Sequence, residues 1–147
     1  MNLNRAWHKF ILRLSMSNWI SSQKRYKLLR WGVKIGRSFV GQQVIFDSDF
    51  PEEIEIGDHC AITMRCTILT HYVKSLPSGG RTYVKGHVKI GNYVFIGAHT
   101  VICHPITIGD GAFIGAGSII TRDIPAYEVW AGVPAKFIRK RFIAGTV

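Results

Sequence analysis

Residues 88–120 read VKIGNYVFIGAHTVICHPITIGDGAFIGAGSII, and an isoleucine recurs at every sixth position of this stretch. The row consists of Ile90, Ile96, Ile102, Ile108, Ile114 and Ile120. Helices repeat every 3.6 residues and strands every 2 residues, so neither element produces an interval of six. A fixed short period is typical of a solenoid, and hexapeptide repeats belong to parallel β-helices. The stretch therefore predicts an all-β solenoid.

A second row of inward candidates follows the isoleucines by four residues, and an earlier run at Ile56, Ile62 and Ile68 keeps the same interval. The second row reads Cys60, Cys66, Val94, Thr100, Ile106, Ala112, Ser118 and Ile124. Most of these side chains are small or β-branched, which suits a wall that faces a narrow interior. If three repeats complete one turn, the isoleucines stack in columns, and each buried one contributes about 1.5–3 kcal/mol. The glycines that follow several isoleucines predict tight corners, where a Cβ would clash or φ must be positive.

The chain divides into three predicted segments. Residues 1–31 carry apolar residues at helical spacing with basic residues between them, which predicts either a cap on the solenoid end or an interfacial helix pair on anionic lipid. Residues 32–136 form the solenoid, and residues 137–147 form a basic C-terminal tail. The interval from Ile68 to Ile90 is not a multiple of six, so a loop leaves the wall between residues 72 and 88. Loops held by a rigid wall often carry binding sites.

Composition limits the kinds of partner. The net charge of +10 favours an anionic partner, but no nucleic-acid-binding motif is present, so nucleic acid is not expected. Cys60, Cys66 and Cys103 cannot all pair; the first two share a repeat position and are interpreted as core residues. No apolar run of transmembrane length or signal-peptide pattern is evident. The unpaired cysteines favour a reducing compartment, so we expect a cytoplasmic protein. If residues 1–31 lie on anionic lipid, the protein would be peripheral at the inner membrane face. No cysteine or histidine spacing predicts a metal site.

Histidine is the side chain best suited to proton transfer near neutral pH, and the chain has six. There is no serine nucleophile elbow, phosphate-binding loop or His-Glu-x-x-His motif. His59, His71 and His99 share one repeat position, which predicts a common orientation. Only His71 lies where the wall gives way to the loop, so it is the first candidate for a general base.

Three charged residues are candidates for substrate binding. Asp47 and Asp49 belong to an acidic turn that precedes the regular repeats. One of them either orients the imidazole of His71 or holds an acceptor molecule. Arg81 is one of several cations in the 72–88 loop and is the third candidate.

Three motifs carry a resemblance to a known family. They are Val94-Phe95-Ile96-Gly97-Ala98-His99, Ile114-Gly115-Ala116-Gly117-Ser118-Ile119-Ile120-Thr121-Arg122-Asp123-Ile124-Pro125, and Ala131-Gly132-Val133-Pro134-Ala135-Lys136. Together they resemble the hexapeptide-repeat acyltransferases, and among these the O-acetyltransferases of galactosides, maltose, Nod factors and exopolysaccharides. The resemblance covers roughly residues 33–141, and the Ala-Gly-Val-Pro-Ala ending is its most specific part.

The resemblance implies a left-handed β-helix, which is an exception to the right-handed crossover rule. It also implies a homotrimer with active sites between subunits and acetyl-CoA as the donor. In such relatives the general base is the histidine of a Thr-His step before the loop, here Thr70-His71; His99 ranks second, nearer the coenzyme. The coenzyme-binding residues that it implies are Gly97, Ala98, Gly115, Ala116, Thr121, Arg122, Lys136 and Arg139. A backbone N–H of the Gly97-Ala98 coil would stabilise the oxyanion.

The implied function is transfer of an acetyl group from acetyl-CoA to a hydroxyl of a sugar in the synthesis of surface polysaccharide or lipopolysaccharide. The acceptor would be a sugar, a sugar nucleotide or a lipid-linked sugar. Two alternatives remain open at this point: N-acetylation of an amino sugar, and a non-catalytic β-helix scaffold.

Overall fold

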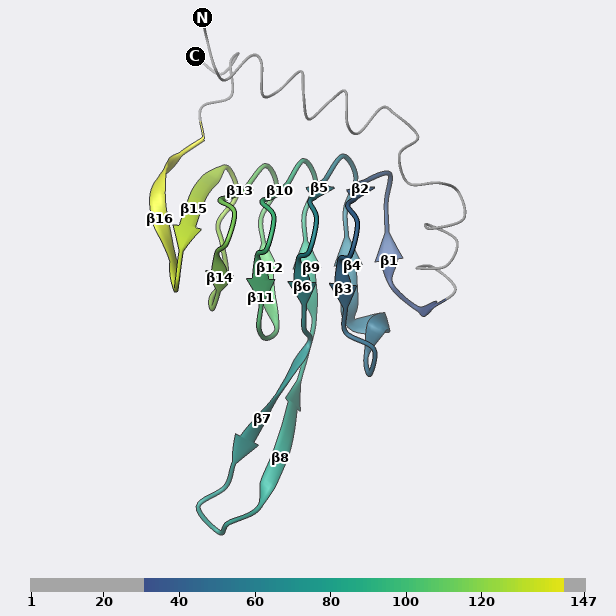
Figure 1. The fold of residues 1–147 in the computed structure, drawn as a ribbon, viewed down its shortest axis with the longest axis vertical. Coiled ribbons are helices and arrows are strands. Elements are labelled where there is room, and N and C mark those ends of the chain that lie inside the picture. Colours follow the sequence, from purple (N-terminus) through teal and green to yellow (C-terminus); the bar gives the residue numbers. More distant parts are fainter. Residues whose placement is uncertain (1–30, 142–147) are drawn as a thin grey trace, which may run out of the picture.

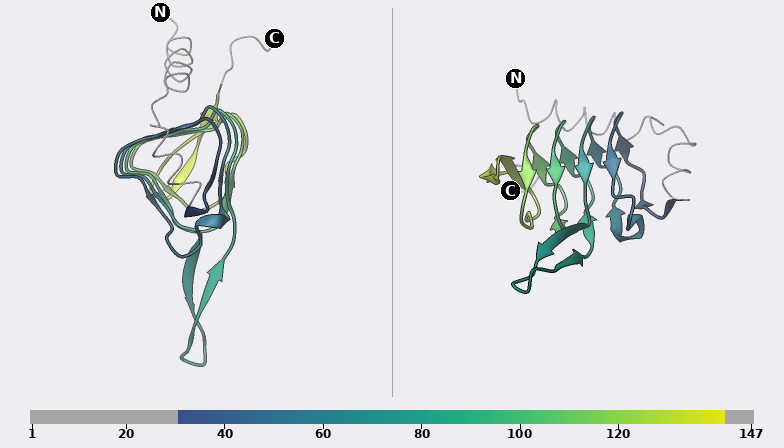
Figure 2. Two further views of the ribbon diagram at one scale, coloured as in Figure 1. Left: turned by 90° about the vertical axis from the view of Figure 1, so that its right-hand side faces the viewer. Right: turned by 60° about the horizontal axis from the view of Figure 1, so that its bottom comes forward.

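The computed structural model describes residues 31–141. The predicted helices of the N-terminal segment and the last six residues lie outside this range. The described residues form a column of short parallel strands with a triangular cross-section, and a long hairpin projects from one corner (Figures 1 and 2). Within the described range, no helix has the length and apolar character needed to cross a bilayer.

Three sheets make the three sides of the column. Sheet A has the order β1-β4-β9-β12, sheet B the order β2-β5-β10-β13-β15-β16, and sheet C the order β3-β6-β11-β14. The bounds are β1 Lys34–Ile35, β2 Phe39–Val40, β3 Ile45–Phe46, β4 Ile54–Ile56, β5 Ala61–Ile62, β6 Thr67–Ile68, β7 His71–Ser75, β8 Arg81–Lys85, β9 Val88–Ile90, β10 Phe95–Ile96, β11 Val101–Ile102, β12 Ile106–Ile108, β13 Phe113–Ile114, β14 Ile119–Ile120, β15 Glu128–Gly132 and β16 Ala135–Lys140, with a 3-10 helix η1 at Pro51–Glu53. Each coil of the column thus contributes one strand to each sheet.

The isoleucine columns predicted from the repeat form the core. Ile90 pairs with Ile108 in sheet A, Ile96 with Ile114 in sheet B, and Ile102 with Ile120 in sheet C. All six isoleucines are at most 1 % exposed. The predicted second row is buried as well, from Cys60 to Ile124. Because the interior is this dry, burial raises the pKa of the Cys60 thiol to about 11.

The glycines after the isoleucines are needed because neighbouring coils approach closely there. A Cβ on Gly97 would lie 2.4 Å from the backbone nitrogen of Ala116 in the next coil. The positive φ angles fall two residues later in the corner, for example 57° at Tyr93 and 60° at His99. Of the two predicted reasons for these glycines, close approach is the one that applies, and the positive φ angles fall on other residues.

The 72–88 loop is an ordered antiparallel hairpin of β7 and β8, in which His71 pairs with Lys85 and Ser75 with Arg81. The column continues beyond it without a change of register, since β9 pairs with β4. Residues 137–140 of the predicted basic C-terminal segment belong to β16, which pairs antiparallel with β15. The turn between those two strands contains the Val133–Pro134 cis peptide.

The isoleucine columns should dominate the stability of the column. Ile102→Ala removes buried methyl groups and leaves a cavity, so we expect the free energy of unfolding to fall by about 2–5 kcal/mol. Ile138→Ala removes the same atoms from a side chain that is 57 % exposed on β16, and its effect should stay within about 0.5 kcal/mol. Urea unfolding of both variants measures the difference, and equal losses would show that the columns are not the main stabilising element.

Candidate active site

The carboxyl ends of the sheet C strands bring four segments to one corner of the column. Asp47 follows β3, His71 follows β6, His104 follows β11, and Arg122 follows β14. Because β3 pairs with β6, the backbone N–H of Asp47 donates to Ile68 O at 2.9 Å, and Asp47 lies beside the chain that leads to His71. The ladder therefore joins residues that are 24 positions apart in the sequence. We call this the histidine corner.

Asp47 and His71 form a hydrogen-bonded pair at this corner. Asp47 Oδ2 lies 2.7 Å from His71 Nδ1, and the same oxygen accepts hydrogen bonds from the Thr70 backbone N–H at 2.8 Å and the Thr70 hydroxyl at 2.7 Å. Asp47 Oδ1 accepts the Asp49 backbone N–H at 3.0 Å. Asp47 is only 3 % exposed, so its carboxylate has no face left for a substrate. Of the two roles expected for Asp47, these contacts favour orienting His71 over holding an acceptor.

The protonation state of Asp47 fixes the tautomer of His71. Burial by itself raises the pKa of Asp47, but the hydrogen bonds from Thr70, Asp49 and His71 outweigh it and lower the pKa from 3.8 to about 2. An ionised carboxylate can only accept hydrogen bonds, so Nδ1 of a neutral His71 must carry the proton. Nε2 then holds its lone pair on the side away from Asp47. This is the arrangement of a general base.

Three further side chains surround the imidazole of His71. Asp49 Oδ2 lies 3.8 Å from Nε2, and the Asp49 side chain is 61 % exposed. The ring centroids of Phe50 and Tyr83 lie 5.4 Å and 5.5 Å from that of His71. Neither aromatic residue was predicted from the sequence. The position of Tyr83 follows from the hairpin register, whereas Phe50 has no signal in the sequence because it lies in an irregular turn.

The foot of the hairpin is attached to η1. Lys85 Nζ lies 4.6 Å from the centroid of the Phe50 ring and 3.7 Å from Glu53 Oε1. His87 Nδ1 lies 2.7 Å from Glu53 Oε2. These contacts hold the hairpin against the turn that carries Asp49 and Phe50, and so they define one side of the site.

The other histidines of the shared repeat position behave differently from His71. His59 and His99 have positive φ angles of 58° and 60° at corners of the column, and the His59 ring stacks on Tyr93 at 4.9 Å. His71 instead begins β7. The predicted common orientation of the three is therefore wrong for His71, because the hairpin replaces the usual corner. His99 lies at the corner between sheets B and C, one side of the column away from His71.

Most of the candidate coenzyme residues lie at that second corner, between sheets B and C. Gly97 and Gly115 are held together by ladder bonds: the Gly97 N–H donates to Ile114 O and the Gly115 N–H to Trp130 O, both at 2.9 Å. Ala98 O accepts the N–H of Gly117 at 2.8 Å, which places Ala98 directly below the Ala116-Gly117 corner. The Gly97 N–H is thus already bonded, so of the Gly97-Ala98 pair expected to stabilise an oxyanion, the Ala98 N–H stays the candidate.

The remaining coenzyme candidates do not lie together. Lys136 pairs with Ala131 at the beginning of β16 and belongs to the B–C corner, and Arg139 pairs with Val129 further along the same strand. Thr121 and Arg122 follow β14 and belong to the histidine corner. Along one chain, about six extended residues separate equivalent positions at the two corners, a span of at most about 20 Å. The structure therefore divides the predicted coenzyme set rather than gathering it around His71.

Arg81 is also remote from the imidazole. It lies at the far end of β8, four residues from Lys85, and pairs with Ser75. At about 3.3 Å per residue this is a path of about 13 Å along the strand. Arg81 therefore cannot contact the same atoms of a substrate as His71.

Asp47, Asp49 and His71 also have the composition of a cation site, with one ligating atom of each within 4.8 Å of the others. However, the Asp47 oxygen nearest the imidazole already accepts three hydrogen bonds, from Thr70 and His71. Among the residues that the structure describes, this donor set fits a hydrogen-bonded Asp–His pair better than it fits a metal.

Comparisons with known proteins assign the chain to a family. The family model described as bacterial transferase hexapeptide (six repeats) matches residues 79–122. Protein CapG of Staphylococcus aureus is 38 % identical over 140 residues, which cover 89 % of this chain and 77 % of CapG. The chain belongs to the hexapeptide-repeat transferase family.

Solved structures agree with this assignment. A maltose O-acetyltransferase from Clostridium difficile 630 is 25 % identical with a TM-score of 0.67, over 97 % of this chain and 90 % of that one. A galactoside acetyltransferase in complex with coenzyme A is 26 % identical with a TM-score of 0.62, over 93 % and 80 % of the two chains. AntD, an N-acyltransferase from Bacillus cereus solved with dTDP and coenzyme A, has a TM-score of 0.67 at 24 % identity, and the chain spans 64 % of its length. The column is thus the left-handed β-helix of this family.

The buried Asp47 carboxylate should make stability depend on pH. Its pKa is about 2 in the folded protein and 3.8 as the reference value, so its ionised form stabilises the fold above about pH 4 and this contribution is lost as the pH falls toward 2. We expect the difference in unfolding free energy between the wild type and Asp47→Asn to shrink by about 2 kcal/mol between about pH 6 and about pH 2. Urea titrations at the two pH values measure it, and a constant difference would contradict the ionised pair.

Proposed function

We propose that the protein is an acetyl-CoA-dependent O-acetyltransferase that acts on a sugar, with His71 as the general base. The observation that carries this proposal is the Asp47–His71 pair, in which a buried carboxylate leaves Nε2 of the imidazole with a free lone pair. Membership of a transferase family and the likeness to a galactoside acetyltransferase in complex with coenzyme A support the reaction type. A non-catalytic scaffold would have no use for an imidazole oriented in this way.

In the proposed reaction, the Asp47–His71 pair acts as the general base. An acceptor hydroxyl gives its proton to His71 Nε2 while its oxygen attacks the thioester carbonyl carbon of acetyl-CoA. The tetrahedral intermediate then expels the coenzyme A thiolate, which takes up a proton, and an acetyl ester remains on the acceptor. Asp47 stabilises the imidazolium that forms, as the carboxylate of a catalytic triad does. A positioned base contributes about 10²–10⁴-fold to such a rate.

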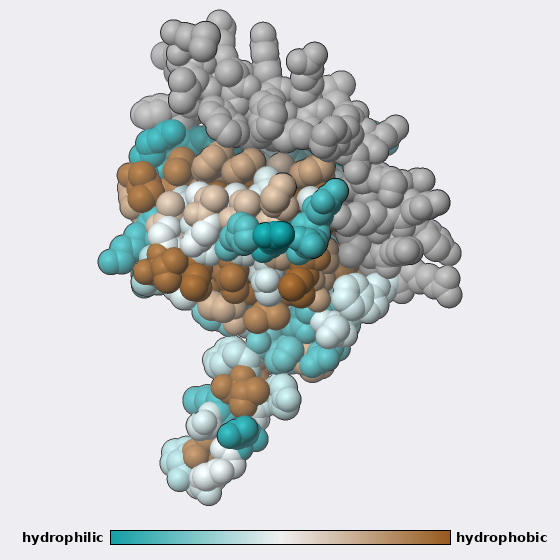
Figure 3. Space-filling view, in the orientation of Figure 1, coloured by the Kyte–Doolittle hydropathy of each residue, from teal (hydrophilic) through white to brown (hydrophobic). Residues whose placement is uncertain are grey.

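We propose that the complete site lies between two copies of the chain in a homotrimer. One copy would supply the histidine corner, and its neighbour would supply the B–C corner with Ala98, Ala116 and Lys136 for coenzyme A. The outward residues of sheet C support this arrangement. Ile45, Thr67, Val101 and Ile119 pair in one row across the sheet, and Figure 3 shows an apolar row across this face.

The cations Arg122, Lys136 and Arg139 are our candidates for the phosphates of coenzyme A. Thr121 precedes Arg122 at the histidine corner. Asp49 is the candidate for the acceptor, because its exposed carboxylate lies beside Nε2 and can accept a hydrogen bond from a second hydroxyl. A role in the synthesis of surface polysaccharide accommodates such an acceptor. N-acetylation of an amino sugar is the second candidate, favoured by the likeness in fold to AntD.

His71 should be essential for turnover and dispensable for the fold. With a panel of sugars as acceptors, we expect His71→Ala to lower kcat by about 10²–10⁴-fold, because the variant lacks the positioned base that takes the proton of the acceptor hydroxyl. His99→Ala is the matched control and should change kcat far less. Release of the free coenzyme A thiol during acetyl transfer measures kcat for both variants. Normal turnover in His71→Ala, together with a large loss in His99→Ala, would move the base to His99.

The apolar row on sheet C should hold the trimer together. Val101→Lys places a charge in the middle of the row, and we expect it to give monomers, because an unpaired buried charge costs several kcal/mol. Thr107→Lys makes the same change on the outward face of sheet A, where the residue is exposed, and should leave the trimer intact. Light scattering coupled to size-exclusion chromatography separates the outcomes. A trimer that persists in Val101→Lys would show that this face is not the interface.

A further inference from the structure

The hairpin has two faces, and only one of them continues the active site. In an antiparallel ladder, paired residues and every second residue along each strand share a face. His71 pairs with Lys85, Val73 with Tyr83, and Ser75 with Arg81. These three pairs therefore share what we call the His71 face. Tyr72, Lys74, Thr82 and Val84 lie on the opposite face.

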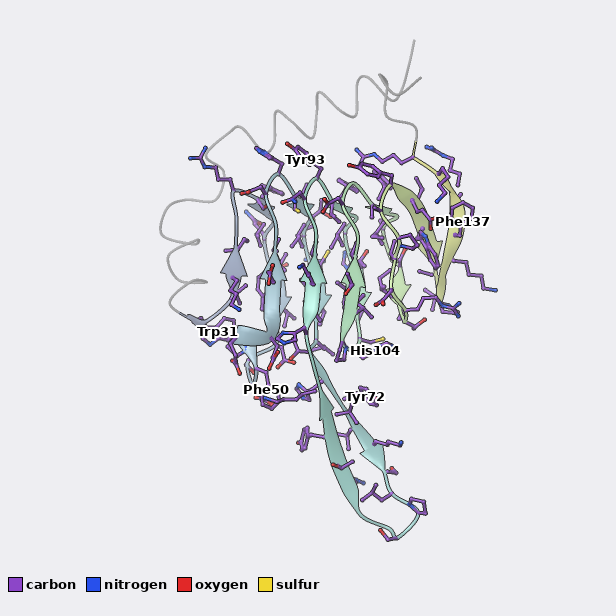
Figure 4. The ribbon with its side chains drawn as sticks, turned by 180° about the vertical axis from the view of Figure 1, so that it is seen from behind. Trp31, Phe50, Tyr72, Tyr93, His104 and Phe137 are labelled. Carbon is purple, nitrogen blue, oxygen red and sulfur yellow. The ribbon has the colours of Figure 1, made fainter. Side chains whose placement is uncertain are left out.

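The contacts at the foot of the hairpin show in which direction each face points. On the His71 face, both His71 and Lys85 contact the ring of Phe50. On the opposite face, the Tyr72 ring lies 6.0 Å from that of His104 in the next coil. Figure 4 shows Phe50 on one side of the hairpin and Tyr72 with His104 on the other. The His71 face thus looks toward the turn that carries Asp49, and an acceptor held at Nε2 can extend along it.

Tyr83 is the first residue that such an acceptor meets beyond the imidazole. Its ring lies 5.5 Å from that of His71 with a tilt of 45°, and the residue is 64 % exposed. An exposed aromatic ring combines a flat apolar surface with a polar tip. It can therefore pack against the C–H face of a sugar ring while its hydroxyl bonds to a sugar oxygen.

Arg81 lies one pair further out on the same face. It is exposed and forms no ion pair or side-chain hydrogen bond with the residues in the described range. Residues 71–88 contain Lys74, Arg81 and Lys85 but no aspartate or glutamate. Lys85 is occupied by Glu53 and Phe50, and Lys74 lies on the opposite face. Arg81 is thus the cation of the hairpin that can bind an anion next to a sugar on Tyr83, and a guanidinium suits a phosphate.

We propose that the acceptor is a sugar that carries a phosphate, bound along the His71 face with its ring on Tyr83 and its phosphate at Arg81. This inference rests on the proposed function and names the acceptor class for it. A sugar 1-phosphate, a nucleotide sugar and a sugar linked to a lipid through diphosphate share this chemistry. In this proposal, Asp47 and His71 perform the proton transfer, and the hairpin selects the acceptor that carries the hydroxyl.

Acceptor kinetics test the inference. Glucose, galactose and N-acetylglucosamine are each offered to the full-length protein as the methyl glycoside, the 1-phosphate, the nucleotide diphosphate derivative and a short prenyl diphosphate derivative. We expect the wild type to favour the phosphorylated forms of the sugar that it accepts. The preference among those three forms identifies the source of the phosphate.

The variants assign the effect to the His71 face. Arg81→Gln should raise KM for the phosphorylated acceptor by about 10- to 100-fold, the loss expected for one charge-assisted hydrogen bond, without changing KM for the methyl glycoside. Lys74→Gln removes the same charge from the opposite face and should change neither value. Tyr83→Ala should raise KM for both forms. In Lys74→Gln, kcat at saturation should also stay close to that of the wild type, because this residue lies on the face away from the acceptor.

Two results would overturn the inference in different ways. If the wild type acetylates methyl glycosides as well as their phosphorylated forms, or if Arg81→Gln and Lys74→Gln behave alike, the hairpin does not select a phosphate, and the proposed function still stands. If no form of any sugar is acetylated, the proposed function fails and the inference fails with it.

Discussion

The register between consecutive coils is the constraint on which the rest of the molecule depends. Each strand of two or three residues is too short to be stable alone, and it is held by ladder bonds to the coil below and by an isoleucine that points into the core. A slip of one residue would turn these isoleucines outward and polar residues inward. Because the register cannot slip, residues of different coils meet at a corner with little freedom. Asp47 reaches His71 in this way.

A buried carboxylate at such a corner would destabilise the fold if its oxygens lacked partners. Asp47 avoids this because Thr70 donates twice, and Asp49 and His71 once each. The same four contacts also decide the chemistry, since they keep the carboxylate ionised and so direct the proton of a neutral His71 to Nδ1. Stability and the proposed proton transfer therefore depend on one cluster of hydrogen bonds.

The sequence predicted the regular parts of this structure and missed the parts that break the period. The columns that include Ile96 and Ile102 followed from the interval of six, because every coil repeats the same burial. The same interval located the loop before Val88 but said nothing of its antiparallel register, so Tyr83 was not recognised beside His71. Whether Asp47 orients His71 or holds an acceptor depended on which strand β3 pairs with. The sequence does not reveal this pairing, because the first coil is irregular. The sequence likewise did not show that the Gly97 N–H is bonded, since its ladder bond to Ile114 is a contact between coils.

The hairpin is inserted between β6 and β9 without disturbing the column, because β9 resumes pairing with β4 as though nothing intervened. The backbone groups of β7 and β8 bond to each other, and only the foot of the hairpin contacts the turn at Glu53. The arm can therefore change in length or composition during evolution while the scaffold and the proton-transfer pair remain as they are. With the acceptor site proposed above, exchanging this single appendage would give such an enzyme a new acceptor, and the hairpin is the natural segment to transplant when specificity is redesigned.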